Sequence, residues 1–505
     1  MFSFHRLLIV YVVAIPLALI LGYMVATPDM ASIAVVLLVF FVLALPLLMQ
    51  WSHWLMIFLW NSAFIAGFLP GQLRLWLVFA ALTFGLGVVN YVMGHRSFLR
   101  APELTKPLLF LAAVVVLTAK IRGGVGLKAL GSGSYGGKHY VEVLGTIIGY
   151  FALTSQPISI FKSARTVKWF FLSGLSYGLA NLIYALGPTL YILYYFISPD
   201  FAASQAAADF GAGVVKRFAG LAPSATALFC FILARWGIRG VFEWDKPWRL
   251  LLLIAAMAGC LFSGFRGGIA FLCALLVVQF FIEGLWRTSL LPVFVGAGIL
   301  CMAPVLLFAN KMPFAVQRAL AVLPAVDINP NVRTETIGST EWRLEMWRTV
   351  WPEVPKYLLV GKGYAIDPTD LYLASEAGRR GLLPDYSESL TAGDYHSGPL
   401  SVLIPFGAGG TIAFLWLLGA GIKVLYCNRR YGDARLKLIN DFFFTYFLAE
   451  CLFFLFVFGD LKSQLCLFVG ILGLSVSLNG GVCRKPAVAR KAAIPSSLAE
   501  PVAVA

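Results

Sequence analysis

Charged side chains are scarce in this chain. They account for 12% of its 505 residues, whereas soluble proteins carry about 25%. This balance excludes an ordinary soluble domain, and apolar runs of the length that crosses a bilayer, about 17–25 residues, recur from end to end. Because lipid-exposed backbone must satisfy its own hydrogen bonds, the runs predict helices. The alternating segments that are typical of a membrane barrel are lacking.

We therefore expect an all-α polytopic membrane protein with about 12–14 transmembrane helices and one large extracytoplasmic loop. Several of the expected spans are short enough to be half-helices or re-entrant segments. The run 167–197 contains Pro188 and is long enough to be kinked or strongly tilted. The expected spans are 7–27, 31–49, 54–69, 74–93, 107–121, 140–155, 167–197, 218–235, 249–264, 268–283, 290–309, 397–421, 440–458 and 464–482.

The long polar segment 310–396 contains no cysteine, although the chain has eight in all. We therefore expect neither a disulfide framework nor a cysteine-based metal site there. The acidic residues of the segment show no metal-ligand spacing, so we expect no metal and no cofactor. The first apolar run follows His5-Arg6 without a convincing small-residue cleavage site, which favours an uncleaved first helix over a removed signal peptide.

The formal charge of +15 is concentrated in short connections between spans. With about fourteen spans, these connections fall on the side of the N-terminus, which the positive-inside rule makes cytoplasmic. We therefore expect cytoplasmic N- and C-termini, an outward-facing loop, and no nucleic-acid partner. The basic residues that define this side include Arg100, Lys106, Lys162, Arg165, Arg235, Arg239, Lys423, Arg429, Arg430, Arg435 and Lys437.

One outward connection breaks the positive-inside rule, because it carries Lys120, Arg122, Lys128 and Lys138. Two explanations remain open. Either a short span has been misplaced, or this is an external surface that attracts phosphate or anionic lipid.

These patterns divide the chain into four parts. Residues 1–309 form the N-terminal part of the membrane domain, with about 9–11 spans, and residues 397–482 form its last spans. Between them lies the extracytoplasmic loop 310–396. The tail 483–505 lacks apolar periodicity, and we expect it to be cytoplasmic and disordered.

Within the loop, a tryptophan-rich helix is expected. Ser339 or Thr340 can cap it, and Pro352 stops it. Arg343, Trp347 and Trp351 are spaced four apart, so they share one face of this helix.

Arg266 and His396 are the main candidates for chemistry. Arg266 stands among glycines between two apolar runs, and arginine grips phosphate through two hydrogen bonds at once. The alternative is an interfacial arginine that snorkels to lipid head groups. His396 is the last polar residue before a span, and imidazole suits proton transfer near neutral pH. Taken alone, a histidine at such a position is more often an interfacial residue.

Arg343 can supply a second guanidinium to a diphosphate, or it can stack on Trp347 in an interfacial helix. Asp394 is close to His396 in sequence, but spacing does not show whether it orients the imidazole. Weaker candidates for binding a diphosphate or a glycan are Arg318, Arg348, Lys362, Asp394 and Trp347.

Taken together and in order, these residues resemble the O-antigen ligase / O-antigen polymerase superfamily of bacterial membrane glycosyltransferases. In that family a Ser-Gly-Ser-Arg-Gly-like turn comes first, followed by an Arg with a Trp a few residues on, a Pro/Gly-x-Gly stretch, a His-Asn-x-x-Leu at the start of a span, and a Gly-x-x-Gly. Here Phe265 replaces a small polar residue and Ser397 replaces the Asn. The resemblance covers roughly residues 250–415. The matching segments are Ser263-Gly264-Phe265-Arg266-Gly267, Arg343 with Trp347, Pro355 with Gly361-Lys362-Gly363, His396-Ser397-Gly398-Pro399-Leu400 and Gly407-Ala408-Gly409-Gly410.

The resemblance implies a GT-C-like fold in the bacterial cytoplasmic (inner) membrane. It also implies transfer of a glycan from an undecaprenyl-diphosphate carrier to an acceptor hydroxyl on the outer side of that membrane. Arg266 and Arg343 would neutralise the diphosphate leaving group, and His396 would be the general base of a metal-independent, inverting reaction. Alternatively, His396 binds the diphosphate while another group takes the proton.

The resemblance leaves the acceptor open. A ligase passes a finished polymer to a lipid A-core sugar, which we favour, a polymerase joins repeat units, and a protein O-oligosaccharyltransferase modifies Ser or Thr. The alternative from a different class is a membrane transporter or flippase. Charges that are paired inside the spans would support this alternative. We expect the charges near span interiors, Asp441 and Glu450, to be unpaired.

Overall fold

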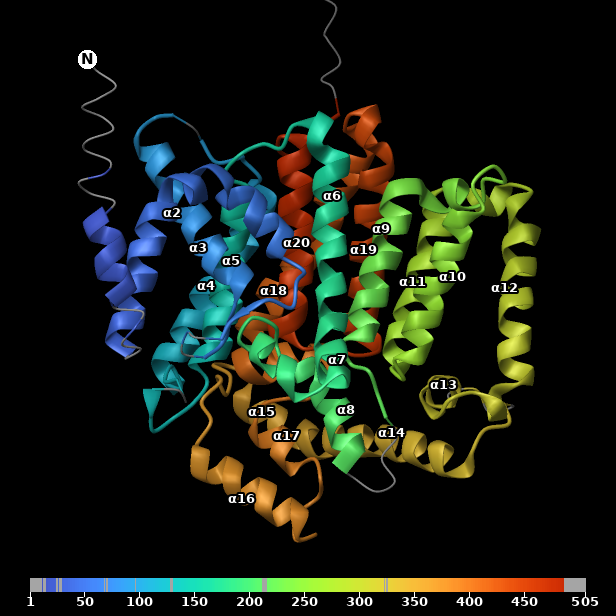
Figure 1. Ribbon diagram of the computed structural model, residues 1–505. Coiled ribbons are helices and arrows are strands. Elements are labelled where there is room, and N and C mark those ends of the chain that lie inside the picture. Colours follow the sequence, from blue (N-terminus) through green and yellow to red (C-terminus); the bar gives the residue numbers. More distant parts are fainter. Residues whose placement is uncertain are drawn as a thin grey trace, which may run out of the picture.

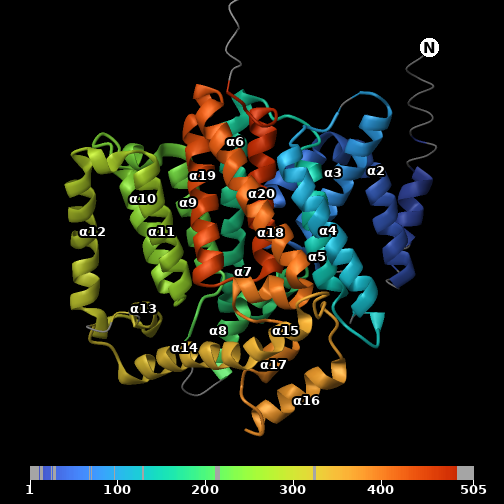
Figure 2. The same ribbon diagram turned by 180° about the vertical axis from the view of Figure 1, so that it is seen from behind.

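The computed structural model describes residues 11, 15–23, 26, 30–67, 69, 71–95, 97–127, 130–210, 216–321, 323 and 326–485. Long helices stand side by side in one body, and a layer of short helices covers one end of it (Figures 1 and 2). The expected all-α polytopic membrane protein is confirmed. The GT-C-like assignment and the division of the chain into four parts stay predictions.

The N-terminal half consists of helices and one two-stranded hairpin. Its elements are α2 (Met30–Leu59), β1 (Ile65–Ala66), β2 (Leu73–Arg74), α3 (Leu75–Val92), α4 (Pro102–Arg122), α5 (Gly137–Leu153), η2 (Ile160–Lys162), α6 (Ser163–Leu172), η3 (Ser173–Leu175), α7 (Ser176–Leu186), η4 (Pro188–Tyr195) and α8 (Asp200–Phe210).

The remaining described elements are helical. They are α9 (Leu221–Val241), α10 (Trp248–Phe262), α11 (Arg266–Ile282), η5 (Leu285–Arg287), α12 (Leu290–Leu307), η6 (Ala309–Lys311), α13 (Phe314–Leu320), α14 (Pro330–Val350), η7 (Trp351–Glu353), α15 (Val354–Tyr357), α16 (Pro368–Arg379), α17 (Ser387–Thr391), α18 (Gly398–Tyr431), η8 (Ala434–Leu436), α19 (Lys437–Phe456) and α20 (Leu461–Asn479).

Among the described residues, eight helical stretches are long and apolar enough to cross a membrane. They include α3, α4, α9, α12, α18, α19 and α20, and the eighth runs from η2 through α7. This count is lower than the 12–14 that the sequence predicts. Three expected spans correspond to α5, α10 and α11, which have 17, 15 and 17 residues. The expected span 7–27 lies partly outside the described residues.

Two of the expected spans, 31–49 and 54–69, do not exist as separate helices. The single helix α2 covers the first and part of the second. The chain then forms the hairpin β1–β2, in which Ile65 pairs with Arg74 and Ala66 with Leu73. The prediction of a span at 54–69 is therefore wrong, and Gly71 at the turn has a φ of 84° that favours glycine.

The expected run 167–197 is broken rather than kinked. Its helical part ends at Leu186, because Gly187 takes a φ of 99° and Pro188 starts a separate 3-10 helix. The short helix α8 comes next, which the sequence did not predict.

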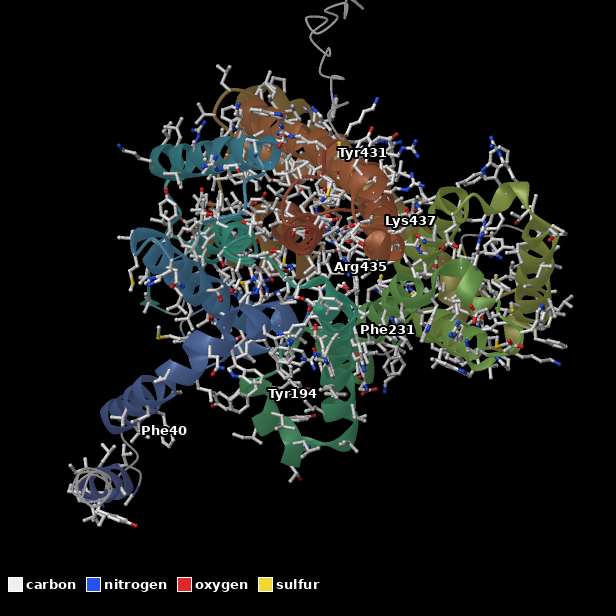
Figure 3. All side chains as sticks on the ribbon, turned by 90° about the horizontal axis from the view of Figure 1, so that it is seen from above. Phe40, Tyr194, Phe231, Tyr431, Arg435 and Lys437 are labelled. Carbon is white, nitrogen blue, oxygen red and sulfur yellow. The ribbon has the colours of Figure 1, made fainter. Side chains whose placement is uncertain are left out.

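The loop helices α13 to α17 lie at one end of the molecule (Figures 1 and 2). The basic connection between α18 and α19 lies at the opposite end, where Figure 3 looks down on Tyr431, Arg435 and Lys437. The loop and this basic connection therefore lie at opposite ends of the protein, as the sequence predicts.

The basic connection between α4 and α5 lies at the loop end. Arg122 Nε donates to the Gly361 carbonyl at 2.8 Å, and Tyr135 N donates to the Ile366 carbonyl at 2.8 Å. These contacts join the connection to the loop, and the choice between a misplaced span and an external surface is not tested by them. An anion-attracting surface stays a prediction.

The core lies around α20. In the most apolar 18-residue stretch of this helix, 83% is buried inside the protein. In α12 the corresponding 18-residue stretch is not buried at all. Yet its mean hydropathy of 2.4 is the highest among the eight candidate spans of the described residues. All three views show α12 at the edge of the molecule. A helix that is apolar on every side and unburied by protein is suited to lipid.

Asp441 is paired, contrary to the prediction from sequence. Its carboxylate lies 2.7 Å from Arg429 Nε and 3.1 Å from Lys437 Nζ. All three residues lie at the end opposite the loop, so this ion-pair network is remote from the loop helices. Glu450 lies deeper in the same helix, α19, and lines a cavity that is described below.

Candidate functional site

The turn between α10 and α11 places Arg266 at the loop end of the membrane domain. Gly264 has a φ of 79°, which allows the chain to reverse there. From the loop, Arg318 Nη1 donates to the Gly264 carbonyl at 2.9 Å and so fixes the turn. Arg266 is the first residue of α11.

The Arg266 guanidinium faces α14. Its Nη1 donates to Thr340 Oγ1 at 3.3 Å and its Nη2 to Ser339 Oγ at 3.5 Å. Both bonds are long and both acceptors are neutral. In the part of the chain that the structure describes, no carboxylate forms an ion pair with Arg266, so its charge is available to an anion.

Two more arginines share a single carboxylate next to Arg266. Glu335 Oε1 lies 2.5 Å from Arg217 Nη2 and 3.2 Å from Arg318 Nε. Burial, followed by the charge of Arg217, lowers the pKa of Arg318 to about 10. Sequence reasoning missed both Arg217 and Glu335. The basic pair of Lys216 and Arg217 directly before an apolar run was the available signal.

Arg343 completes the cluster. Its Cζ lies 5.6 Å from the centre of the Phe458 ring, a cation–π contact. Burial, and next the charge of Arg266, lower the pKa of Arg343. Like charges that depress one another's pKa indicate a site where a bound anion would relieve the repulsion.

His396 is held by three neighbours at the start of α18. Its Nδ1 lies 3.3 Å from Asp394 Oδ1. Its ring makes edge contacts with Trp342 and Phe458, at 5.2 and 5.6 Å between ring centres. The backbone φ of His396 is 49°, a left-handed conformation that is unfavourable for this residue type. The surroundings therefore impose one orientation on the imidazole.

The helix α14 connects Arg266 with His396. Ser339 and Thr340 face Arg266, and Trp342, less than one turn further on, contacts His396. Because a helix rises 1.5 Å per residue, the two candidates meet neighbouring turns of one rigid element. Phe458 in turn contacts both His396 and Arg343.

Ser339 and Thr340 do not cap α14, contrary to the prediction. The helix begins at Pro330, and Asn329 is its N-cap, whose side chain accepts from Asn331 N. The Asn-Pro pair was the signal, because Asn caps helices and Pro suits the first helical position. Trp347 does share a face with Arg343, and its Nε1 donates to the Tyr395 carbonyl at 2.8 Å, next to His396.

The turn Gly361-Lys362-Gly363 does not join the arginines. Lys362 N donates to the Ile404 carbonyl at 2.7 Å, and Gly363 N donates to the Pro405 carbonyl at 2.9 Å. These bonds form where α18 is broken by Gly407, which has a φ of 61°. The hydrogen bonds between this turn and the broken helix α18 therefore attach the loop to the membrane domain. Burial, followed by the charge of Lys356, lowers the pKa of Lys362.

Arg348 stands apart. It is exposed, and it lies five residues after Arg343, which turns its side chain toward another side of α14. The structure thus assembles Arg266, Arg343, Arg318 and His396 with Asp394 and Trp347, and leaves Arg348 and Lys362 outside. Within the described residues, no group of three or more His, Cys, Asp or Glu side chains is arranged to hold a metal ion.

One end of this polytopic helical membrane protein thus brings together four arginines and a histidine that Asp394, Trp342 and Phe458 restrain. Residues 250–415 match the family model described as O-antigen ligase, and this match supports the resemblance to the O-antigen ligase superfamily. The segment runs from α10 through the loop into α18 and contains Arg266, Arg343 and His396. No curated protein matches the chain.

Proposed function

We propose that this protein is an O-antigen ligase-like glycosyltransferase. It transfers a glycan from an undecaprenyl-diphosphate carrier to an acceptor hydroxyl, for which we propose a sugar of the lipid A core. The single observation that carries the proposal is that α14 contacts both Arg266, which has no carboxylate partner among the described residues, and the oriented His396. The family match supports the ligase or polymerase type of function in general.

In this proposal the diphosphate leaving group lies among the arginines. Arg266 and Arg343 take the phosphate oxygens, since the described part of the chain gives neither an ion pair. Arg318 and Arg217 keep the potential positive although Glu335 neutralises one charge. Fixed cations stabilise the charge that develops on the departing phosphate without reorganisation during the reaction.

His396 is the proposed general base. With Nδ1 directed at Asp394, its Nε2 is left to accept the proton of the attacking hydroxyl. The acceptor oxygen forms a bond to the anomeric carbon, the bond from that carbon to the phosphate oxygen breaks, and the electron pair leaves with the diphosphate. Direct displacement inverts the anomeric centre. The alternative, in which His396 binds the diphosphate, uses the same contacts.

We place the protein in the bacterial inner membrane, with the loop end outside and both termini in the cytoplasm. The support is the positive-inside rule together with the position of Arg435 and Lys437 at the end opposite the loop.

The test is gene deletion followed by complementation, with surface polysaccharide and lipopolysaccharide separated on a gel. Wild type, His396→Ala and the control Arg348→Ala are compared at equal expression. The ligase is supported if the deletion strain loses long glycan from lipid A and accumulates it on the carrier lipid. In addition, Arg348→Ala should restore the wild-type profile and His396→Ala should not. Single repeat units on the core would identify a polymerase, and an unchanged glycan profile in the deletion would favour a transporter.

A further inference from the structure

Two adjoining cavities lie beside the arginine cluster. The larger, of about 430 Å³, lies among the membrane helices, and the smaller, of about 90 Å³, lies next to it. Arg74, Tyr177 and Phe201 line both, so the two spaces meet at these side chains. We call the pair the Arg74 cavity.

The Arg74 cavity reaches the proposed reaction centre. Gly267 and Gly268, which directly follow Arg266, line the larger space. The Phe458 ring lines it too, and this ring contacts His396 on one side and Arg343 on the other. A molecule in the cavity would therefore present one end to His396.

The lining combines polar side chains with aromatic rings. The polar groups of the larger space include Asn61, Arg74, Tyr177, Thr226, Glu450 and Gln464. Among them, Glu450 is only 3% exposed and lies in the apolar helix α19, and the described residues supply it no ion pair. A buried carboxylate without a partner is costly, so its presence in a cavity wall points to a polar ligand.

The smaller space is charged as well. Lys138, Arg74, Glu142 and Asp200 are among its lining residues. Such a lining is unsuited to an isoprenoid tail, because each charge would lose its hydration without compensation. Donors and acceptors together with rings such as Phe271 and Phe453 suit a saccharide, whose hydroxyls need hydrogen bonds and whose apolar faces need flat surfaces.

The backbone that carries Arg74 is itself unusual for a membrane domain. The hairpin β1–β2 docks on η4 through Ile65 N to the Phe196 carbonyl and Gly67 N to the Tyr195 carbonyl, both at 2.9 Å. A Cβ at Gly67 would meet the Tyr195 carbonyl at 2.4 Å, so only glycine fits this contact. Non-helical backbone in a membrane domain is tolerated where it is enclosed by protein or lines a cavity, and Ile65 and Arg74 of the hairpin line the smaller space.

We propose that the Arg74 cavity is the binding site for the acceptor saccharide, with Arg74 and Glu450 as its recognition groups. This inference rests on the proposed function. The donor glycan is tethered to the diphosphate at Arg266 and Arg343, so the acceptor hydroxyl approaches His396 from the side of Phe458, which lines the cavity and contacts His396. A volume of about 430 Å³ suits a short saccharide.

The first experiment measures transfer by the full chain in lipid nanodiscs, with the lipid-linked glycan as donor and purified core oligosaccharide as acceptor. Arg74→Gln and Glu450→Gln are compared with Arg348→Gln and Glu341→Gln, which alter exposed residues of α14. We expect a KM for the acceptor that is at least ten times higher in the cavity variants, a donor KM within twofold of wild type, and unchanged controls. Equal rises in both KM values would assign the cavity to the donor glycan, and unchanged KM values would overturn the proposal.

A second measurement does not depend on turnover or on the folding of those variants. Ser463 lines the larger space and is exposed, so the modification of Ser463→Cys by a small methanethiosulfonate reagent is followed in a chain that otherwise lacks cysteine. Core oligosaccharide should slow the modification at least threefold, whereas inorganic pyrophosphate should not. No protection by the oligosaccharide rejects the acceptor site. Protection without any transfer by the unaltered protein would reject the proposed enzyme activity and leave the saccharide site standing.

Discussion

Arg266 and Arg343 differ from Arg217 and Arg318 in what they contact. Arg217 and Arg318 form ion pairs with Glu335. Arg266 instead donates to two hydroxyl groups, and Arg343 contacts an aromatic ring. The sequence predicted Arg266 and His396 because each stands next to an apolar run, and Arg343 because it lies four residues before Trp347 on the expected loop helix. Arg217 and Glu335 were not predicted, since no local pattern shows which distant charges will meet.

Arg266→Ala should lower the rate of glycan transfer by about 10²–10³-fold, the usual cost of removing one donor that stabilises developing charge. Arg266→Lys should recover only part of this loss, because an ammonium does not make two parallel hydrogen bonds to phosphate. The measurement is the initial rate with purified protein. Arg348→Ala is the control, and its failure to retain activity would remove the distinction that the structure makes.

Trp342→Ala should reduce kcat by at least about tenfold, because the ring that orients His396 is lost and small misplacements of a catalytic group are costly. The donor KM should change little. Trp351, the first residue of η7 directly after α14 and 66% exposed, supplies the control Trp351→Ala. Equal decreases in kcat for both variants would indicate that the loss of any large side chain in this region lowers activity, and not the loss of the contact with His396.

Glu335→Gln should destabilise the protein by about 3 kcal/mol, because Arg318, with 5% of its side chain exposed, would keep its charge without a carboxylate. The midpoint of thermal unfolding in detergent measures this. Inorganic pyrophosphate should raise the midpoint of the variant more than that of wild type, since an anion can replace the carboxylate. A smaller rise in the variant would place the anion away from this cluster.

At the scale of elements, α14 and the hairpin β1–β2 show where sequence patterns fail. The first part of α14 is polar, so apolar periodicity revealed only its second half, from Trp342 onward. The hairpin is apolar enough to resemble a span, and short apolar runs do not distinguish helix from strand. Its contacts with η4 decide its structure, and they join residues more than a hundred positions apart.

The break in α18 is the element on which the loop docks. Gly407→Ala should lower the stability by at least about 2 kcal/mol and abolish activity, because its φ of 61° disfavours a side chain and a Cβ would lie 2.6 Å from the Leu358 carbonyl. Gly419→Ala, in the same helix with no atom within 4 Å of its Cβ, should be neutral or slightly stabilising. Thermal unfolding and transfer rates check both.

At the scale of the whole molecule, composition was sufficient for the fold class, because a bilayer allows few architectures. It was not sufficient for the number and order of spans. The expected span 54–69 is a hairpin preceded by a helix end, and 167–197 is two helical segments separated by Gly187. Positive-φ glycines and docking contacts decide such breaks, and hydropathy does not report them.

The orientation of the molecule is testable with single cysteines in a cysteine-free chain. Leu382→Cys, at a loop position that is 73% exposed, should react with a membrane-impermeant maleimide in intact spheroplasts. Arg435→Cys, at the opposite end, should react only after lysis. The reverse pattern would invert the proposed topology and place the site in the cytoplasm.

The helix α14 also limits how related sequences can diverge. Because Glu335, Ser339 and Arg343 are spaced four apart on one helix, a single inserted residue among them would rotate the rest of the helix by about 100° and separate the arginine cluster from His396. Among the described residues, the helix α16 makes no such contact with the site, whereas beside and in α17 Tyr386 contacts Trp342 and Leu390 packs in the same apolar cluster as Trp347. Across homologues, insertions and deletions should therefore accumulate around α16 and be absent between Asn329 and Trp347, so that the length of one helix is inherited more faithfully than the residues around it.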